Sequence, residues 1–240
     1  MWRQTMAGVL VGVAALAAAP AAHAQDQSLV LNFGGFVPRG ADARADGDVL
    51  NADRCLNTTG SCEPLLFDIS DFNGFTFSGE YLVGLGEFFE AGGGVGFYQH
   101  TTHSVYEQLT YDDGTEIEQD LKLRIVPITA TVRFIPTGRH AAVQPYIGGG
   151  LGIFNWRYSE AGDFVDTGDG SIFRASYSKS GTSFGPVAFG GVKFRVTRGV
   201  LLGGEVRYQK AEGTDLPDGF LGDRIDLSGF TYSGLVQFRF

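Results

Sequence analysis

Residues 230–240, FTYSGLVQFRF, carry the clearest structural signal in the chain. From Phe230 to Phe240 every second residue is aromatic, aliphatic or glycine, and all but one of the residues between them are polar. A period of two places successive side chains on opposite faces of a β-strand, so one face is apolar and the other largely polar. A stretch of this length can cross the hydrocarbon layer of a bilayer as a tilted strand. The pattern therefore predicts a membrane-crossing strand.

Seven earlier segments alternate in the same way, with more noise. They lie at residues 28–37, 75–85, 89–103, 118–135, 142–158, 192–196 and 200–209. In the segment 118–135 the apolar residues change parity near Pro127, from Leu121, Leu123 and Ile125 to Ile128. Proline cannot donate to a strand ladder, so we expect a β-bulge at or beside Pro127. The facing of the segment 142–158 stays open.

The connections between these segments alternate in length. Short connections lie at 86–88, 136–139 and 197–199, and long ones lie at 39–74, 104–117, 159–181 and 210–227. Short periplasmic turns and long extracellular loops are the rule for outer-membrane barrels, and an even strand number leaves both termini in the periplasm. A β-sandwich is the alternative, but it gives no reason for strict alternation. We predict an all-β fold, an antiparallel up-and-down transmembrane β-barrel of about eight strands.

Composition agrees with this fold class. The chain holds 36 Gly, 20 Phe and 9 Tyr among 240 residues, which disfavours helices and suits strands and tight turns. Its mean hydropathy is +0.01, as expected when only alternate residues meet lipid. The net charge is −9, and most acidic residues lie in the long connections. This acidic surface argues against nucleic acid as a partner.

The first 24 residues have the three parts of a secretory signal peptide. Arg3 supplies the positive charge, residues 7–19 form the apolar stretch, and Ala22-His23-Ala24 matches a cleavage site. We expect cleavage between Ala24 and Gln25, which leaves residues 25–240 as one barrel domain. An uncleaved anchor is the alternative, although the apolar stretch is short for a spanning helix.

The chain has two cysteines, Cys55 and Cys62, within one long connection. In an exported protein two such close cysteines indicate a disulfide. A metal site is disfavoured because no histidine lies nearby and two thiolates do not complete a tetrahedron. Two free thiols are the remaining alternative.

Taken together, the chain resembles the small outer-membrane β-barrel proteins of the OmpA and OmpW type. The resemblance rests on the C-terminal strand, on Pro145-Tyr146-Ile147-Gly148-Gly149-Gly150-Leu151-Gly152 and on Phe189-Gly190-Gly191-Val192-Lys193-Phe194. In that family a C-terminal aromatic residue preceded by alternating apolar residues is the signal read by the barrel-assembly machinery. The matching residues here are Tyr232, Val236, Phe238 and Phe240. The resemblance implies a bacterial outer-membrane location, with lipid and lipopolysaccharide as surroundings, but it implies no single activity.

Charged residues also fall on the polar faces of the predicted strands. They are Glu80, Arg133, Lys193, Arg195, Glu205, Arg207 and Arg239. Charges near the bilayer midplane cannot face lipid cheaply, so we expect them in the lumen. An eight-stranded barrel is just wide enough for side chains to fill, so salt bridges are expected to plug it. The alternative interpretation is a gate or an ion path.

Three function classes follow. The first is a structural or surface-interaction barrel with a filled lumen and an extracellular ligand that the sequence does not identify. The second is a narrow OmpW-like conduit for small or apolar solutes. The third, a lipid A-modifying enzyme, is disfavoured because His103 and Ser104 are neighbours and would point to opposite faces of a strand. We expect no catalytic residues, no metal and no cofactor.

Overall fold

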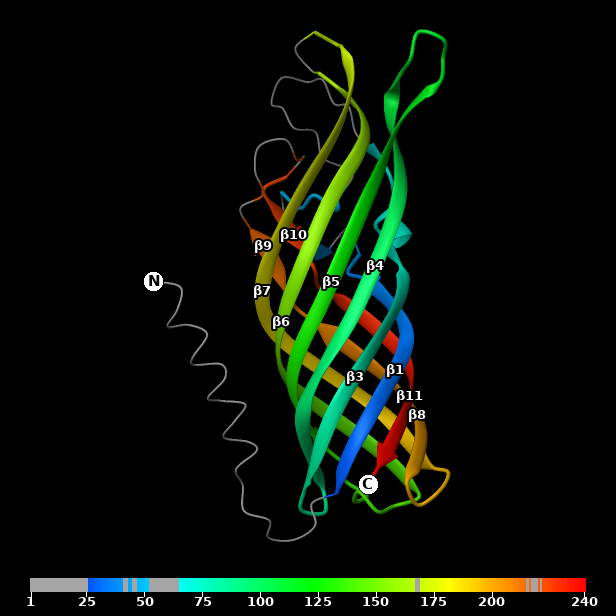
Figure 1. Cartoon of the computed structure of the whole chain (residues 1–240), viewed down its shortest axis with the longest axis vertical. Helices are drawn as coiled ribbons and strands as arrows, with labels where there is room; N and C mark the ends of the chain where they lie inside the picture. Colours follow the sequence, from blue (N-terminus) through cyan, green and yellow to red (C-terminus); the bar gives the residue numbers. More distant parts are fainter. Residues whose placement is uncertain are drawn as a thin grey trace, which may run out of the picture.

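The computed structural model describes residues 26–40, 43–44, 47–51, 65–166, 169–214, 216, 220 and 222–240. The predicted signal peptide with its Ala24–Gln25 cleavage site, Cys55 and Cys62 all lie outside these residues. Eight strands form the barrel (Figure 1): β1 (Gln27–Pro38), β3 (Gly74–Leu85), β4 (Phe89–Thr110), β5 (Glu116–Phe134), β6 (Val143–Val165), β7 (Ile172–Arg195), β8 (Val200–Gln209) and β11 (Gly229–Arg239). The small elements β2 (Leu65–Leu66), η2 (Ile69–Phe72), β9 (Glu212–Thr214) and β10 (Arg224–Asp226) lie in the long connections.

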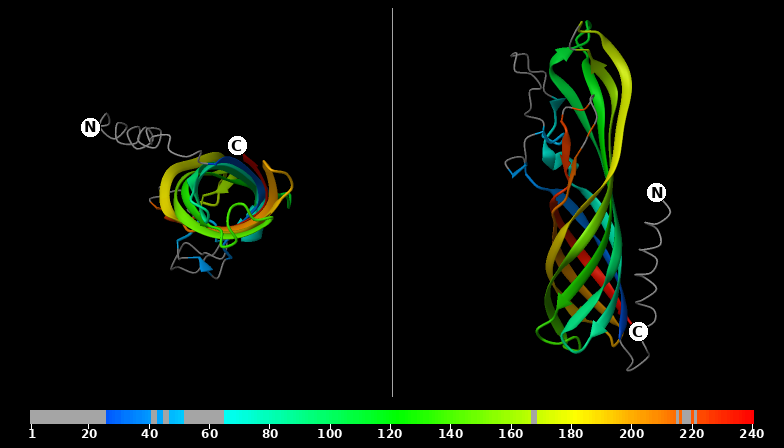
Figure 2. Two further views of the ribbon diagram at one scale, coloured as in Figure 1. Left: turned by 90° about the horizontal axis from the view of Figure 1, so that it is seen from below. Right: turned by 90° about the vertical axis from the view of Figure 1, so that its left-hand side faces the viewer.

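The eight strands form one closed antiparallel ring. Each pairs with its neighbours along the chain, and β1 closes the ring by pairing with β11 from Ser28–Arg239 to Pro38–Gly229. The view along the barrel in Figure 2 shows this ring. The predicted up-and-down barrel of about eight strands is confirmed, and the β-sandwich is wrong because the two edge strands of an open sheet are paired here.

The strands differ in length, which the sequence pattern did not predict. β1, β3, β8 and β11 have 10 to 12 residues, whereas β4, β5, β6 and β7 have 19 to 24. The long strands continue beyond the ring as a curved sheet (Figure 1). The predicted long loops at 104–117 and 159–181 are therefore wrong, because most of these residues extend the β4–β5 and β6–β7 hairpins.

The outer face of the ring is apolar. Large exposed side chains follow every strand around it, including Phe75, Ile147, Leu151 and Phe184, which are 64%, 66%, 70% and 73% exposed. In a water-soluble protein an apolar surface of this extent would be costly, but it suits a hydrocarbon layer. This part of the molecule is called the membrane half below.

The sheet beyond the ring has the opposite arrangement. It is called the extracellular half below, after the general rule that barrels of this kind have short turns on the periplasmic side and longer connections outside. A buried apolar cluster fills its concave side, and its members are Phe36, Val49, Leu50, Phe72, Tyr98, Leu121, Leu123, Ile125, Phe154, Trp156, Tyr158, Val187, Ala211, Leu216, Phe220, Ile225 and Leu227. Several of these residues come from the connections after β1 and β8, whose elements η2, β9 and β10 lie beside the sheet in the second view of Figure 2. This cluster is called the extracellular core.

Asp48 ties the two connections together. Its Oδ1 accepts hydrogen bonds from the backbone N–H groups of Leu50 at 3.2 Å and Asp226 at 3.1 Å. The same carboxylate forms a buried salt bridge with Arg44. Satisfying this buried charge holds the two connections together.

The predicted bulge at Pro127 is wrong. β5 pairs with β6 in one continuous register through Val126–Asn155, Pro127–Phe154 and Ile128–Ile153. Leu123 faces inward into the extracellular core, whereas Ile128 faces outward to the lipid. The apolar residues change parity because the apolar side of the sheet changes from inside to outside, while the alternation of the backbone continues. The register shift in β4–β5 lies instead between Val105 and Thr110.

Candidate functional site

The lumen of the membrane half is filled by charged side chains. They come from six strands and comprise Glu80, Glu90, Arg133, Lys193, Glu205, Arg207 and Arg239, called the charged layer below. Of the predicted lumen charges, Arg195 does not join this layer. It lies exposed at the rim and donates from Nη2 to the Ala141 carbonyl at 3.1 Å.

Glu80 and Glu205 form the centre of the first cluster in this layer. Arg133 and Arg207 both form salt bridges with Glu80, and Arg207 reaches Glu205 Oε1 at 2.8 Å. Arg133 Nη2 lies 3.4 Å from Glu205 Oε2, which also accepts from the Tyr146 hydroxyl at 2.9 Å. The two carboxylates therefore share both guanidinium groups, so each charge has an opposite partner.

Glu90 forms the centre of a second cluster. Lys193 Nζ donates to its Oε2 at 2.9 Å, while Arg239 Nη2 and Gln237 Nε2 lie 3.3 Å and 3.2 Å from its Oε1. Glu90, Tyr146 and Gln237 were not among the predicted lumen residues. The inward direction of Glu90 could have been found, because its neighbours Phe89 and Ala91 lie on the outward-facing parity.

Glycines in the barrel wall make room for these side chains. Gly94 pairs with Glu80 across β3 and β4, and a Cβ at this glycine would lie 2.5 Å from Glu80 Cγ. A Cβ at Gly191 would lie 2.7 Å from the Tyr146 hydroxyl. Close approach of large side chains to the opposite backbone thus explains part of the glycine content.

Aromatic rings cover the cations of the first cluster. The Arg133 guanidinium lies 5.2 Å from the Tyr146 ring centroid and 5.1 Å from that of Phe189, and the Arg207 guanidinium lies 4.9 Å from Phe189. At these distances a cation is attracted to the ring face. The charged layer is therefore a network of paired charges and aromatic rings that occupies the lumen at this level.

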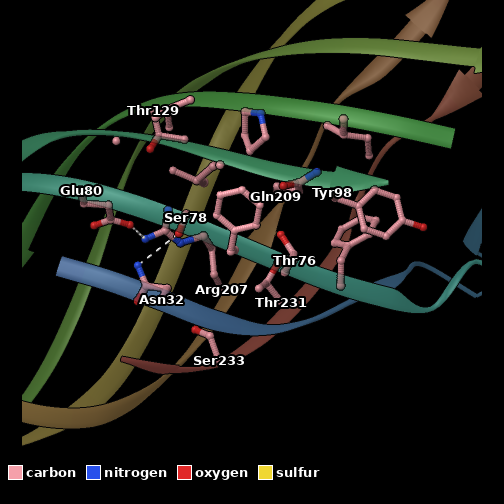
Figure 3. Close-up of a pocket in the computed structure, with 18 of the residues that line it drawn as sticks. Asn32, Thr76, Ser78, Glu80, Tyr98, Thr129, Arg207, Gln209, Thr231 and Ser233 are labelled. Carbon is pink, nitrogen blue, oxygen red and sulfur yellow. Dashed lines mark hydrogen bonds and ion pairs between the residues drawn. The ribbon is translucent and has the colours of Figure 1, made fainter. Parts of the chain in front are cut away.

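A cavity of about 50 Å³ lies between the charged layer and the extracellular core (Figure 3). Its polar lining residues include Asn32, Thr76, Ser78, Gln209, Thr231 and Ser233. Asn32 donates to the Ser78 hydroxyl at 3.2 Å, and Glu80 and Arg207, which form a salt bridge, also line the cavity. Gly96 and Pro127 form part of its wall.

The ladder between β4 and β5 is interrupted at this wall. Pairing stops at Val95–Ile128 and resumes at Tyr98–Ile125. Pro127 has no N–H to donate, so one hydrogen bond of the ladder cannot form there. Phe77 and Val95, whose side chains are exposed on the outer face, also line the cavity.

The remaining predicted site residues lie on the barrel surface or away from one another. Tyr232, Phe238 and Phe240 are exposed on the apolar outer face, and Val236 is half-buried on the same face. His103 faces outward and pairs with Asp120 at 2.5 Å, whereas Ser104 is buried on the inner face. These two residues therefore cannot act as a catalytic dyad. Within the part of the chain that the structure describes, no cluster of metal-ligating side chains occurs.

Comparison with known proteins agrees with this architecture. The family model for the outer membrane protein beta-barrel domain matches residues 9–233. No curated protein matches the sequence. The outer membrane protein OprG from Pseudomonas aeruginosa has a similar structure, with a TM-score of 0.52, 15% identity, and 90% of this chain and 96% of that chain covered. Neisserial surface protein A has a TM-score of 0.44 and 15% identity, covering 90% of this chain and 97% of its own.

The similarity to OprG, at this low identity, concerns the fold alone. The family match extends over most of the sequence and includes all the barrel strands except the end of β11. It agrees with the closed ring, the apolar outer face and the charged interior. The chain therefore belongs to the family of outer membrane proteins with a β-barrel domain.

Proposed function

We propose that this protein is a non-conducting surface-interaction barrel of the bacterial outer membrane. The observation that carries this proposal is the filling of the interior at two levels. The charged layer occupies the lumen of the membrane half, and the extracellular core occupies the concave side of the sheet above it. A cavity of about 50 Å³ between them has room for only a few water molecules.

The extracellular half supplies the surface for interaction. The β4–β5 and β6–β7 hairpins continue beyond the apolar belt, and their outward side chains are mostly polar. A sheet supported by its own apolar core can present such a surface rigidly. Variable extracellular loops on a rigid scaffold are a common place for binding.

Conductance in a planar bilayer tests the closed lumen. The wild-type protein is expected to give no large stable current, whereas a wide porin in the same bilayer serves as the positive control. Small flickering currents agree with transient side-chain rearrangement. A steady porin-like conductance would contradict the proposal, because the charged layer could not then occupy the lumen.

A deletion strain tests the surface role. Loss of the protein is expected to lower adhesion of the cells to host or abiotic surfaces and to leave the uptake of small solutes unchanged. Re-expression of the wild-type chain should restore adhesion. Unchanged adhesion together with reduced uptake would favour the second candidate function.

The second candidate is a narrow conduit for small apolar solutes. It is favoured by the cavity whose wall contains Pro127 and by the interrupted ladder beside it. Pro127→Ala supplies the missing N–H, so it should reduce solute uptake into liposomes if solutes pass this wall. Pro145→Ala, on the exposed face of β6, is the matched control. Equal uptake by wild type and both variants would exclude this path.

A further inference from the structure

Three cations lie together on the outward face of the long strands. The registers of β4, β5 and β6 align Gln99 with Arg124 and Arg157 in one row, and place Lys122 beside Ser159 in the next. Lys122, Arg124 and Arg157 are all exposed and point away from the extracellular core. They are called the outer basic cluster below.

The height of this cluster places it at the edge of the apolar belt. Four residues below Gln99 and Arg124 on the same outward face, Val95 and Ile128 are 54% and 47% exposed. Phe97 is exposed between these levels. Four residues of a strand rise about 13 Å, and less along the membrane normal because barrel strands are tilted. The cluster therefore lies where hydrocarbon gives way to lipid headgroups, on the side of the long hairpins.

The charges of the cluster are not neutralised by the protein. Arg124 stands directly opposite Arg157 in the β5–β6 ladder, and like charges in this position are destabilising. Among the described residues, no salt bridge joins Lys122, Arg124 or Arg157 to a carboxylate.

The nearest carboxylate along β5 on this face is that of Asp120, two residues from Lys122. Its Oδ1 lies 2.5 Å from His103 Nδ1, and within the described part of the chain it forms no salt bridge with a cation of the cluster. Arg157 donates from Nη2 to the Ser178 hydroxyl at 3.2 Å, which is a neutral acceptor. The cluster therefore keeps a net positive charge that an external anion could neutralise.

The cluster also lines a surface hollow whose lining suits an anionic group. A surface depression of about 300 Å³ is lined by Gln99, Lys122, Arg124, Arg157 and Ser159. Three of these side chains are cationic and none is acidic. Two guanidinium groups can each present two parallel N–H donors to phosphate oxygens, while the lysine adds a point charge.

We propose that the outer basic cluster binds a phosphate group on the lipid headgroup of lipopolysaccharide in the outer leaflet. The phosphorylated sugar headgroup of that lipid lies at the same level as the cluster, directly above the acyl chains. Its phosphate places oxygen acceptors in the hollow, and its acyl chains cover the exposed apolar side chains below. The proposal requires the outer-membrane location but does not require a closed lumen.

Lipid binding by the intact barrel tests this proposal. Wild-type protein in phosphatidylcholine nanodiscs is titrated with fluorescent lipopolysaccharide, and the test variant carries Lys122→Gln, Arg124→Gln and Arg157→Gln. The matched control carries Arg174→Gln, Arg195→Gln and Arg198→Gln, which removes three exposed cations elsewhere. We expect binding by the test variant to weaken at least about tenfold, with the control unchanged.

Two further titrations identify the ligand group. Lipopolysaccharide stripped of its phosphates should bind the wild type as weakly as intact lipopolysaccharide binds the test variant. Inorganic phosphate at millimolar concentration should not displace the lipid, whereas displacement would indicate a free-anion site and overturn the lipid assignment. Equal binding by wild type and test variant would also overturn the proposal.

Folding and conductance are measured on the same samples. Trp156 lies in the extracellular core, and the other tryptophan, Trp2, belongs to the predicted signal peptide. Unchanged Trp156 fluorescence and unchanged heat-dependent gel mobility would show that the test variant folds. A conducting protein that loses lipid binding on this substitution would contradict the closed lumen and still support the lipid site.

Discussion

The membrane half and the extracellular half are built from the same long strands but have opposite faces buried. On β5, Leu121, Leu123 and Ile125 point inward to an apolar core, whereas Ile128 and Val132 point outward to lipid. The direction of successive side chains alternates without a break across this boundary. The medium outside the sheet changes at this boundary from water to lipid. Apolar side chains are buried inside where water is outside, and charged side chains are buried inside where lipid is outside.

The charged residues change face at the same boundary, in the opposite direction to the apolar ones. In the membrane half, charged residues such as Arg133 and Lys193 are buried in the lumen with their partners. In the extracellular half, Lys122 and Arg124 face outward on the same strand that carries Arg133 inward. The strand β5 therefore contains both arrangements: its inner face is apolar in the extracellular half and polar in the membrane half.

The largest expected effect concerns the charged layer. Replacing Glu80 and Glu205 together by Ala leaves Arg133 and Arg207 buried without carboxylate partners. Breaking a buried pair in this way costs about 3–5 kcal/mol, so the barrel should lose stability or leak ions. Urea unfolding in lipid and bilayer current measure the two outcomes.

The control for this experiment removes the same charge from exposed positions. Glu87→Ala with Glu118→Ala changes two carboxylates that are exposed. The control should behave as wild type in both assays. If the lumen variant were as stable as the control and leaked no more ions than the control, the charged layer would not be what closes the barrel.

The second prediction compares the two apolar faces directly. Leu123→Ala should destabilise the extracellular core by about 2–4 kcal/mol because it leaves a cavity among packed side chains. Ile128→Ala, on the same strand, should cost less because mobile lipid chains fill the space. Trp156 fluorescence during denaturant unfolding measures the difference. Equal losses of stability for the two substitutions would mean that the extracellular core is not packed like the core of a water-soluble protein.

Sequence reasoning succeeded best where lipid limits the choice of residues. Residues 200–209 and 229–239 form β8 and β11 close to their predicted bounds, since each outward position there must be apolar and most inward ones polar or small. It failed at 159–181, where residues 159–165 extend β6 and residues 172–181 extend β7. Their alternation is concealed because Ser176, Ser178 and Ser180 face outward and the inward residues include Lys179.

The candidate site was predicted in part for a similar reason. The parity rule identified most of the charged layer, including Glu80 and Glu205, but it also included Arg195, whose position at the rim depends on strand length. The extracellular core could not be predicted, because residues such as Leu50 and Phe220 come from connections whose contacts are set by the folded sheet. Likewise, the parity change near Pro127 can come from a β-bulge or from a change of the apolar face from inside to outside. Only the strand pairing in three dimensions separates these two explanations.

The third prediction uses pH to separate the two halves. Glu160 lies on the extracellular extension of β6, where burial raises the pKa of its carboxyl to about 7 although the Tyr158 hydroxyl donates to it at 2.9 Å. Between the ordinary pKa of 4.5 and about 7 the folded protein holds a proton that the unfolded chain has released. Stability should therefore rise as pH falls through this window.

The measurement is the unfolding midpoint of the extracellular core, followed through Trp156 at pH 8 and pH 5. The wild type should gain about 1–3 kcal/mol at the lower pH, and Glu160→Gln should lose most of this gain. Glu118→Gln, an exposed substitution on the neighbouring strand, should keep it. A gain of equal size in Glu160→Gln would assign the pH dependence to other groups.

The smallest expected effect concerns an acidic and a basic side chain that pair on the solvent-exposed surface, compared with a similar pair buried in the lumen. His103 Nδ1 and Asp120 Oδ1 lie 2.5 Å apart on the outer face of the extracellular half, with side chains 85% and 53% exposed. Lys193 and Glu90 pair at 2.9 Å in the lumen, with side chains 0% and 1% exposed. Solvent screens an exposed pair and already solvates both partners, so its loss leaves no uncompensated charge. Asp120→Asn should change the free energy of unfolding by less than about 0.5 kcal/mol, whereas Glu90→Gln should cost several times more, because Lys193 and Arg239 would keep their buried charges. Raising the salt concentration should abolish the first effect and leave most of the second. If the two substitutions cost the same in urea unfolding, burial would not be what separates the halves.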